Sequence, residues 1–155
     1  MELTYDNVIK WFDDYFNAFN ENEGNPETAK NMRDYFVPEL EFYSYNVHDE
    51  EKPTGREKLI SAIEHPGFHE AFRPQCYVYD DRQKILVAQL ELQFTETATG
   101  EVFPPKMASA HYYLVQDSNQ DLKIKKILYW VEATSPDEPG ILDRMRKYRQ
   151  EQAGS

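Results

Sequence analysis

The residues best suited to acid–base, nucleophilic or metal chemistry in this chain are four histidines, one cysteine and a few carboxylates. His65 and His69 are four residues apart, but the Pro-Gly dipeptide between them disrupts the helix that would bring both onto one face, so the spacing does not favour a metal pair. His48 precedes three consecutive acids, which is typical of a solvated loop. Cys76 has no second cysteine to pair with, and we expect it to be a small buried hydrophobe.

Two further candidates lie in segments with the pattern of β-strands. Glu91 has a glutamine two residues away on either side; if this polar row faces a pocket, Glu91 could act as a general base with a raised pKa. Simple alternation instead predicts that Leu90 and Leu92 face inward and that the row faces solvent or a partner subunit. His111 could contact a ligand, or it could be a strand residue with an ordinary hydrogen-bond partner.

Composition limits the classes of function. The 155 residues include 9 Phe, 11 Tyr and 2 Trp, which favours a folded domain despite a charged fraction of 29%. The net charge is −11, and residues 1–51 hold 13 acids and 3 bases, so neither nucleic acid nor an anionic membrane is expected as a partner. The sequence has no apolar run long enough to span a bilayer, no basic-then-apolar leader and a single cysteine, so we expect a cytoplasmic protein. It also has no phosphate loop, dinucleotide fingerprint, zinc motif or elbow serine, so no cofactor and no metal is expected.

Hydrophobic periodicity predicts the elements that would position these residues. Apolar residues recur at helical spacing from Val8 to Phe19, and Asn25 followed by proline predicts a second helix to about residue 36. A capping box at residues 54–57 predicts a third helix that ends at residues 65–67. Alternating, β-branched and aromatic segments predict strands at residues 40–45, 75–79, 84–97, 106–116 and 122–132. A last amphipathic helix is predicted at about residues 136–150.

This order, with helices before an antiparallel meander, predicts an α+β domain. Three segments carry a resemblance to a known family: residues 15–20 (YFNAFN), 35–42 (YFVPELEF) and 123–130 (KIKKILYW). With them, the span from about residue 5 to residue 132 resembles the nuclear-transport-factor-2-like superfamily, the cone-shaped, cystatin-like fold of SnoaL-like polyketide cyclases, ketosteroid isomerase and scytalone dehydratase. The resemblance implies one domain over residues 1–155, with its core at about 5–132 and the C-terminal helix outside it. It also implies a curved sheet wrapped around the N-terminal helices, a conical pocket, and a homodimer formed through the outer face of the sheet.

The resemblance further implies candidate catalytic residues. Tyr15 matches the tyrosine of ketosteroid isomerase that donates to the substrate oxyanion, and His111 falls near that enzyme's second donor. The isomerase's aspartate base matches Ser44, which cannot take a proton from carbon without an activating base, so Glu91 is the candidate replacement. Scytalone dehydratase fits worse, because its helix Tyr-Asp pair falls on Phe19 and asparagine.

The expected site therefore combines catalytic candidates with an apolar wall. Tyr15 and His111 would polarise a carbonyl or hold a phenolate where water is excluded. The expected ligand-binding residues are Trp11, Phe19, Ser44, Tyr113, Ile127 and Tyr129. Such a site would bind a small apolar, ring-bearing ligand and could serve a cofactor-independent isomerase, lyase or cyclase. The alternative is a non-catalytic protein-binding or dimerisation module of the same fold, and the sequence leaves both open.

Overall fold

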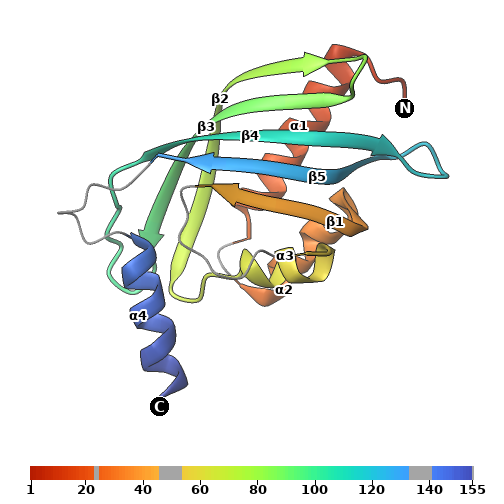
Figure 1. The fold of residues 1–155 in the computed structure, drawn as a ribbon. Helices are drawn as coiled ribbons and strands as arrows, with labels where there is room; N and C mark the ends of the chain where they lie inside the picture. The colour runs from red at the N-terminus through yellow and green to blue at the C-terminus, as the bar shows by residue number, and fades with distance from the viewer. Residues whose placement is uncertain (23–24, 46–53, 133–140, 155) are drawn as a thin grey trace.

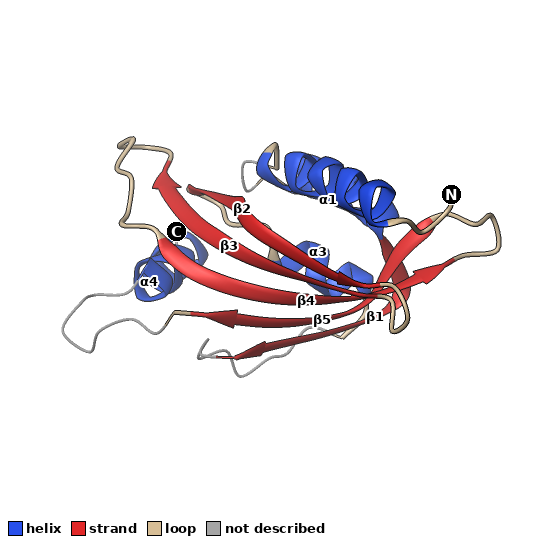
Figure 2. Cartoon of the chain, turned by 90° about the horizontal axis from the view of Figure 1, so that it is seen from above, coloured by secondary structure: helices blue, strands red, loops and turns tan. Residues whose placement is uncertain are grey.

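The computed structural model describes residues 1–22, 25–45, 54–132 and 141–154, and Figure 1 shows how their helices and strands are arranged. Five strands form one sheet in the order β1-β5-β4-β3-β2, with β1 parallel to β5 and the other neighbours antiparallel. The strands are β1 (Phe36–Tyr45), β2 (Phe68–Asp80), β3 (Ile85–Glu96), β4 (Lys106–Gln116) and β5 (Leu122–Val131). The helices are α1 (Tyr5–Asn20), α2 (Pro26–Ala29), the 3-10 helix η1 (Lys30–Tyr35), α3 (Arg56–Ala62) and α4 (Ile141–Ala153). The sheet is curved, with α1 and α3 on the same side of it (Figure 2), so the predicted α+β class is confirmed.

Helix α1 forms where the apolar spacing predicts it. The Thr4 hydroxyl caps its start by accepting a hydrogen bond from the backbone N–H of Asn7 at 3.3 Å, and Asp6 places a negative charge in the first turn. The helix buries one face against the sheet. That face consists of Val8, Phe12, Tyr15, Phe16 and Phe19.

The last residue of α1 also binds the sheet. The Asn20 side chain donates to the carbonyl of Phe72 and accepts from its backbone N–H, both at 2.8 Å. Since β2 is at the edge of the sheet, Asn20 takes the place that a neighbouring strand would have there.

Two of the predicted helices differ from those observed. The second consists of only four α-helical residues, capped by Asn25 as expected, and then becomes 3-10, so β1 begins at Phe36 rather than residue 40. The predicted capping box before α3 is wrong. Gly55 precedes that helix with φ +91° and without a side-chain cap, while Thr54 forms an isolated bridge with Glu41.

Strand β2 is much longer than predicted. It begins at Phe68, immediately after the turn at Gly67, and the sequence indicated only its second half. Pro74 is tolerated because β2 is an edge strand and its pairing with β3 shifts register between Pro74 and Cys76. The extra half-strand brings Glu70 onto the sheet.

Alternation along the strands separates an inner face, which meets the helices, from an outer face. On β3 the predicted inward row is confirmed, since Leu86, Ala88, Leu90, Leu92 and Phe94 are all buried. On β4 the buried row is Ala108, Ala110, Tyr112 and Leu114. On β5 the strand has a bulge, because the pairing with β4 skips Lys125. Beyond it, Ile127 and Tyr129 pair with the inward Tyr112 and Ala110 and so face inward too.

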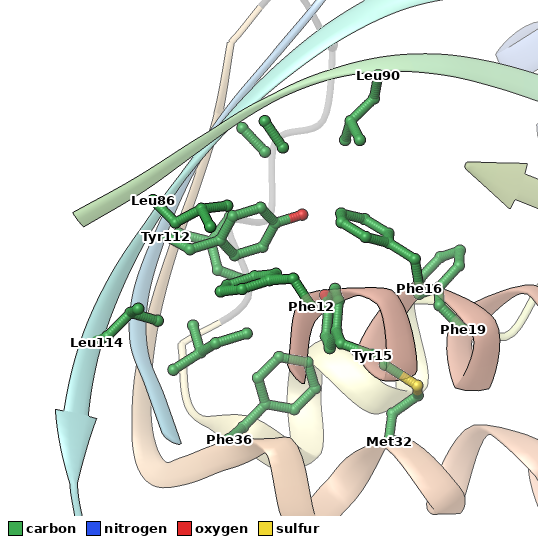
Figure 3. Packing of buried hydrophobic residues seen from close by; sticks show 14 of the residues in the cluster. Phe12, Tyr15, Phe16, Phe19, Met32, Phe36, Leu86, Leu90, Tyr112 and Leu114 are labelled. Atoms are coloured by element: carbon green, nitrogen blue, oxygen red, sulfur yellow. The ribbon is translucent and has the colours of Figure 1, made fainter. Parts of the chain in front are cut away.

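Aromatic rings fill the inner face where α1 crosses it (Figure 3). Phe12 is fully buried, with ring centroids 4.9 Å from Tyr112, 5.0 Å from Trp11 and 5.7 Å from Tyr15. These contacts are tilted or edge-to-face, the geometry that aromatic pairs prefer. No helix in the described part of the chain is both long and apolar enough to cross a membrane.

Candidate functional site

One end of the inner face stays partly open to solvent. There, inward-facing side chains of β1, β2 and β5 keep some exposure to solvent, whereas the rings under α1 are buried. We call this region the open end; it consists of Phe42, Ser44, Glu70, Phe72 and Tyr129. The walls of the open end are aromatic. The Tyr129 ring lies 6.1 Å from Phe72 and 6.4 Å from Phe42, so a ligand there would meet rings.

A glutamate–histidine pair lies at the open end. His65 Nε2 and Glu70 Oε2 are 2.6 Å apart, and the two side chains are only 15% and 13% exposed. The sequence builds the pair locally, since the chain turns at Gly67 (φ +85°) and β2 then carries Glu70 inward between two phenylalanines. The ring of Phe94 is 6.0 Å from that of His65, edge-on. A carboxylate held in this way is a candidate proton acceptor.

Two phenols lie near this carboxylate. Burial raises the pKa of Tyr129, and the negative charge of Glu70 raises it further. Burial also raises the pKa of Tyr15, and Glu70 adds to that shift. Both side chains are therefore protonated at neutral pH and can donate a hydrogen bond.

The hydroxyl of Tyr15 is also bonded to that of Tyr112. This bond lowers the pKa of Tyr15 and raises that of Tyr112, although burial dominates both and leaves both pKa values above the ordinary value. A hydroxyl that accepts a hydrogen bond becomes a stronger donor, since bonds in a chain polarise one another. The pair could thus stabilise negative charge on a ligand oxygen.

Of the sequence-predicted site residues, Tyr15, Phe19, Ser44, Ile127 and Tyr129 lie on the inner side. Trp11 is next to them but not at the open end. Its ring stacks on Tyr15 at 6.1 Å and lines a separate hollow of about 250 Å³ beside Tyr35.

The expected pairing of Tyr15 with His111 is wrong. Since Tyr112 faces inward, its neighbours His111 and Tyr113 must point to the outer face. There His111 contacts the ring of Trp130 at 4.7 Å, and partial burial lowers its pKa. The Lys126 ammonium lies 4.9 Å from the centroid of Tyr113.

Glu91 also faces outward, as alternation predicts, so it cannot replace a base on the inner face. Its carboxylate forms an ion pair with Arg73 at 3.4 Å. Cys76, expected to be buried, is exposed, because it pairs with Gln89 on the outer face.

Sequence reasoning missed the Glu70–His65 pair. The available signal was Phe68-x-Glu70-x-Phe72, an acid between two aromatic residues at strand spacing. His65 and His69 do not act together, since His69 Nε2 instead lies 2.6 Å from the carbonyl oxygen of Asn20. The described ranges contain no group of three His, Cys, Asp or Glu side chains that could hold a metal ion.

Neither a family model nor a curated protein matches the chain. Solved structures do match. ActVI-ORFA from Streptomyces coelicolor superposes with a TM-score of 0.60 at 10% identity, covering 83% of this chain and 97% of that one. Nuclear transport factor 2 from Cryptosporidium parvum gives 0.61 at 11% identity, with coverages of 85% and 98%. A protein assigned as a SnoaL-like polyketide cyclase, from Shewanella putrefaciens, gives 0.61 at 14%, with coverages of 84% and 91%.

These matches span most of both chains in each pair. Their sequence identities are so low that they are evidence for the fold alone. The resemblance inferred from the sequence is confirmed at this level: the chain has the nuclear-transport-factor-2-like fold shared by SnoaL-like proteins.

Proposed function

We propose that the open end binds a small apolar, ring-bearing ligand that has a carbonyl or phenol oxygen. The observation that carries this proposal is the Glu70 carboxylate, largely buried and close enough to the hydroxyls of Tyr15 and Tyr129 for its charge to raise the pKa of both. An apolar wall with a few convergent polar groups is typical of ligand sites.

The same groups support a cofactor-independent isomerase, lyase or cyclase. Glu70 would take a proton from a carbon next to the ligand carbonyl, while Tyr15 or Tyr129 donates to the oxygen on which charge develops. His65 is bonded to one carboxylate oxygen, Oε2, so the other oxygen, Oε1, would be the proton acceptor. Glu70 would thus be the inward-facing general base that could not be identified from the sequence.

The test is ligand affinity, measured by calorimetry with a panel of phenolic and steroid-like compounds. Glu70→Gln should weaken binding of the best phenolic ligand about tenfold or more, since it removes a hydrogen bond to a charged group. Tyr15→Phe should weaken it less, by the two- to tenfold that about 0.5–1.5 kcal/mol of a neutral bond represents.

Glu91→Gln is the matched control, the same substitution on the neighbouring strand but on the outer face. It should leave the affinity unchanged. Equal affinities of the wild type, Glu70→Gln and Tyr15→Phe for every compound would rule out this site.

A second candidate function is dimerisation through the outer face of the sheet. A groove of about 530 Å³ crosses the outer face of β2, β3, β4 and β5, and it is lined largely by apolar or uncharged side chains. Val78 is 64% exposed and Met107 38% in this groove, while the Trp130 ring stacks on Tyr45 at 4.9 Å. Exposed apolar side chains gathered on one face are typical of a protein interface.

A second copy of the chain suits this face. Lys126 on β5 marks one end of the uncharged region, and Glu132, the residue that follows β5, marks the other. A two-fold axis across the strands would bring Lys126 of each copy toward Glu132 of the other, which compensates part of the repulsion between two chains of charge −11.

Val78→Asp should therefore convert a dimer of two 18.3 kDa chains into a monomer, measured by light scattering at tens of micromolar protein. It would bury an unpaired charge within the interface. Val102→Asp is the control, because Val102 is 55% exposed but lies outside the groove. A monomeric wild type would contradict the dimer.

A further inference from the structure

Helix α4 packs against the inner face beside the Glu70–His65 pair. Met145 is buried with Phe68, and the ring of Tyr148 lies edge-on to that of Phe68 at 5.8 Å. The contact is so close at Gly67 that a Cβ there would lie 2.8 Å from the ring of Tyr148. Arg144 adds a second contact, 4.7 Å above the ring of Phe103.

This docking brings Arg149 to the outer nitrogen of His65. Arg149 Nη2 lies 3.3 Å from His65 Nδ1 and 3.3 Å from the carbonyl oxygen of Glu64. A guanidinium can only donate hydrogen bonds, so Nδ1 must be the acceptor and carry no proton. The ring proton is then on Nε2, which donates to Glu70 Oε2 at 2.6 Å.

We propose that Arg149 is a positioning residue that holds His65 as the neutral Nε2–H tautomer, so that Glu70 accepts a hydrogen bond from an uncharged ring and is not paired with an imidazolium. The groups facing His65 are Glu70 from β2, Arg149 from α4 and the uncharged ring of Phe94 from β3. When Arg149 leaves, Nδ1 is free to take a proton, and the ring becomes an imidazolium paired with Glu70. An ion pair of this kind makes the carboxylate a poorer proton acceptor. The state of the candidate base thus depends on the docking of α4.

The consequence for ligands rests on the proposed function, but the tautomer does not. It is measured on the ligand-free protein by long-range proton–nitrogen NMR correlation of the histidine rings, with His65 assigned from its absence in a His65→Gln spectrum. The wild type should show the Nε2–H form. In Arg149→Ala the population with a proton on Nδ1 should rise about tenfold or more at pH 7, the effect of losing one hydrogen bond from a charged donor. Arg149→Lys keeps a cationic donor and should restore most of the wild-type form.

Arg144→Ala is the matched control, since Arg144 helps to dock the same helix through Glu101 and Phe103 without touching His65. It should leave the tautomer unchanged. An Nδ1–H form in the wild type, or equal shifts in Arg144→Ala and Arg149→Ala, would overturn the proposal. If every ligand fails to bind while the tautomer responds as expected, the proposed function falls and this inference stands.

Discussion

Phe12→Ala is expected to lower the free energy of unfolding by about 3–5 kcal/mol, the usual cost of removing a buried phenylalanine ring. Phe12 is fully buried at the centre of the ring cluster, where it contacts both its own helix and Tyr112 of the sheet. The rings around it are held by α1 and β4, so they cannot move in to fill the space, and the cavity term adds to the lost burial. A small domain has only about 5–15 kcal/mol of stability in total, so this one change would consume a large part of it.

Urea denaturation followed by tryptophan fluorescence and by circular dichroism gives the measurement. Tyr5→Ala is the control on the same helix, because Tyr5 is 52% exposed and its truncation should cost no more than about 0.5 kcal/mol. Phe12→Leu should fall between the two. A loss below about 1.5 kcal/mol for Phe12→Ala would mean that the ring cluster is not the core of the fold.

The second large effect is a loss of stability at alkaline pH. Burial raises the pKa of both Tyr15 and Tyr112 above the ordinary value of about 10. In the unfolded chain these hydroxyls ionise near pH 10, whereas in the folded protein they keep their protons. Their contribution to stability is therefore fully present below pH 10 and is lost as the pH rises above it. Each group should reduce the free energy of unfolding by about 1.4 kcal/mol per pH unit, or about 3 kcal/mol for the pair between pH 10.5 and 11.5.

Denaturation at a series of pH values measures this slope, and absorbance at 295 nm follows tyrosine ionisation in parallel. Tyr112→Phe should remove about half of the slope attributed to the pair, and Tyr5→Phe, at an exposed ring, serves as the control. A slope that is the same in the wild type and Tyr112→Phe would show that these two hydroxyls are not the source.

Most of the fold could be predicted because its periodic signals are strong. In both α1 and β3, the spacing of the apolar residues allows only one orientation of the element that buries its large side chains. The first half of β2 escaped prediction because the turn at Gly67 and Pro74 interrupt it, and both are usually breaks. Only the edge position of β2 and its register shift make that proline acceptable, and neither can be read from the local sequence.

The candidate site could be predicted only in part. The inward position of Tyr15 on α1 could be predicted because it follows from the helical period. His111 was assigned to the wrong face of the sheet. The alternation of the buried residues Ala108, Ala110 and Leu114 puts Tyr112 on the inner face and therefore His111 on the outer face. The contact between Glu70 and His65 needs a tight turn, and the link to Arg149 joins residues 84 positions apart, so no short-range pattern could indicate it.

The bond between Asn20 and the edge of the sheet has a consequence for solubility. An edge strand with free N–H and carbonyl groups is a template on which other chains can pair and aggregate. At Phe72 both backbone groups are already occupied by the Asn20 side chain, so an incoming strand would have to displace the end of α1 before it could continue past this point. A single amide at a helix terminus thus interrupts β2 as a template for added strands, which elsewhere charge or proline would have to do.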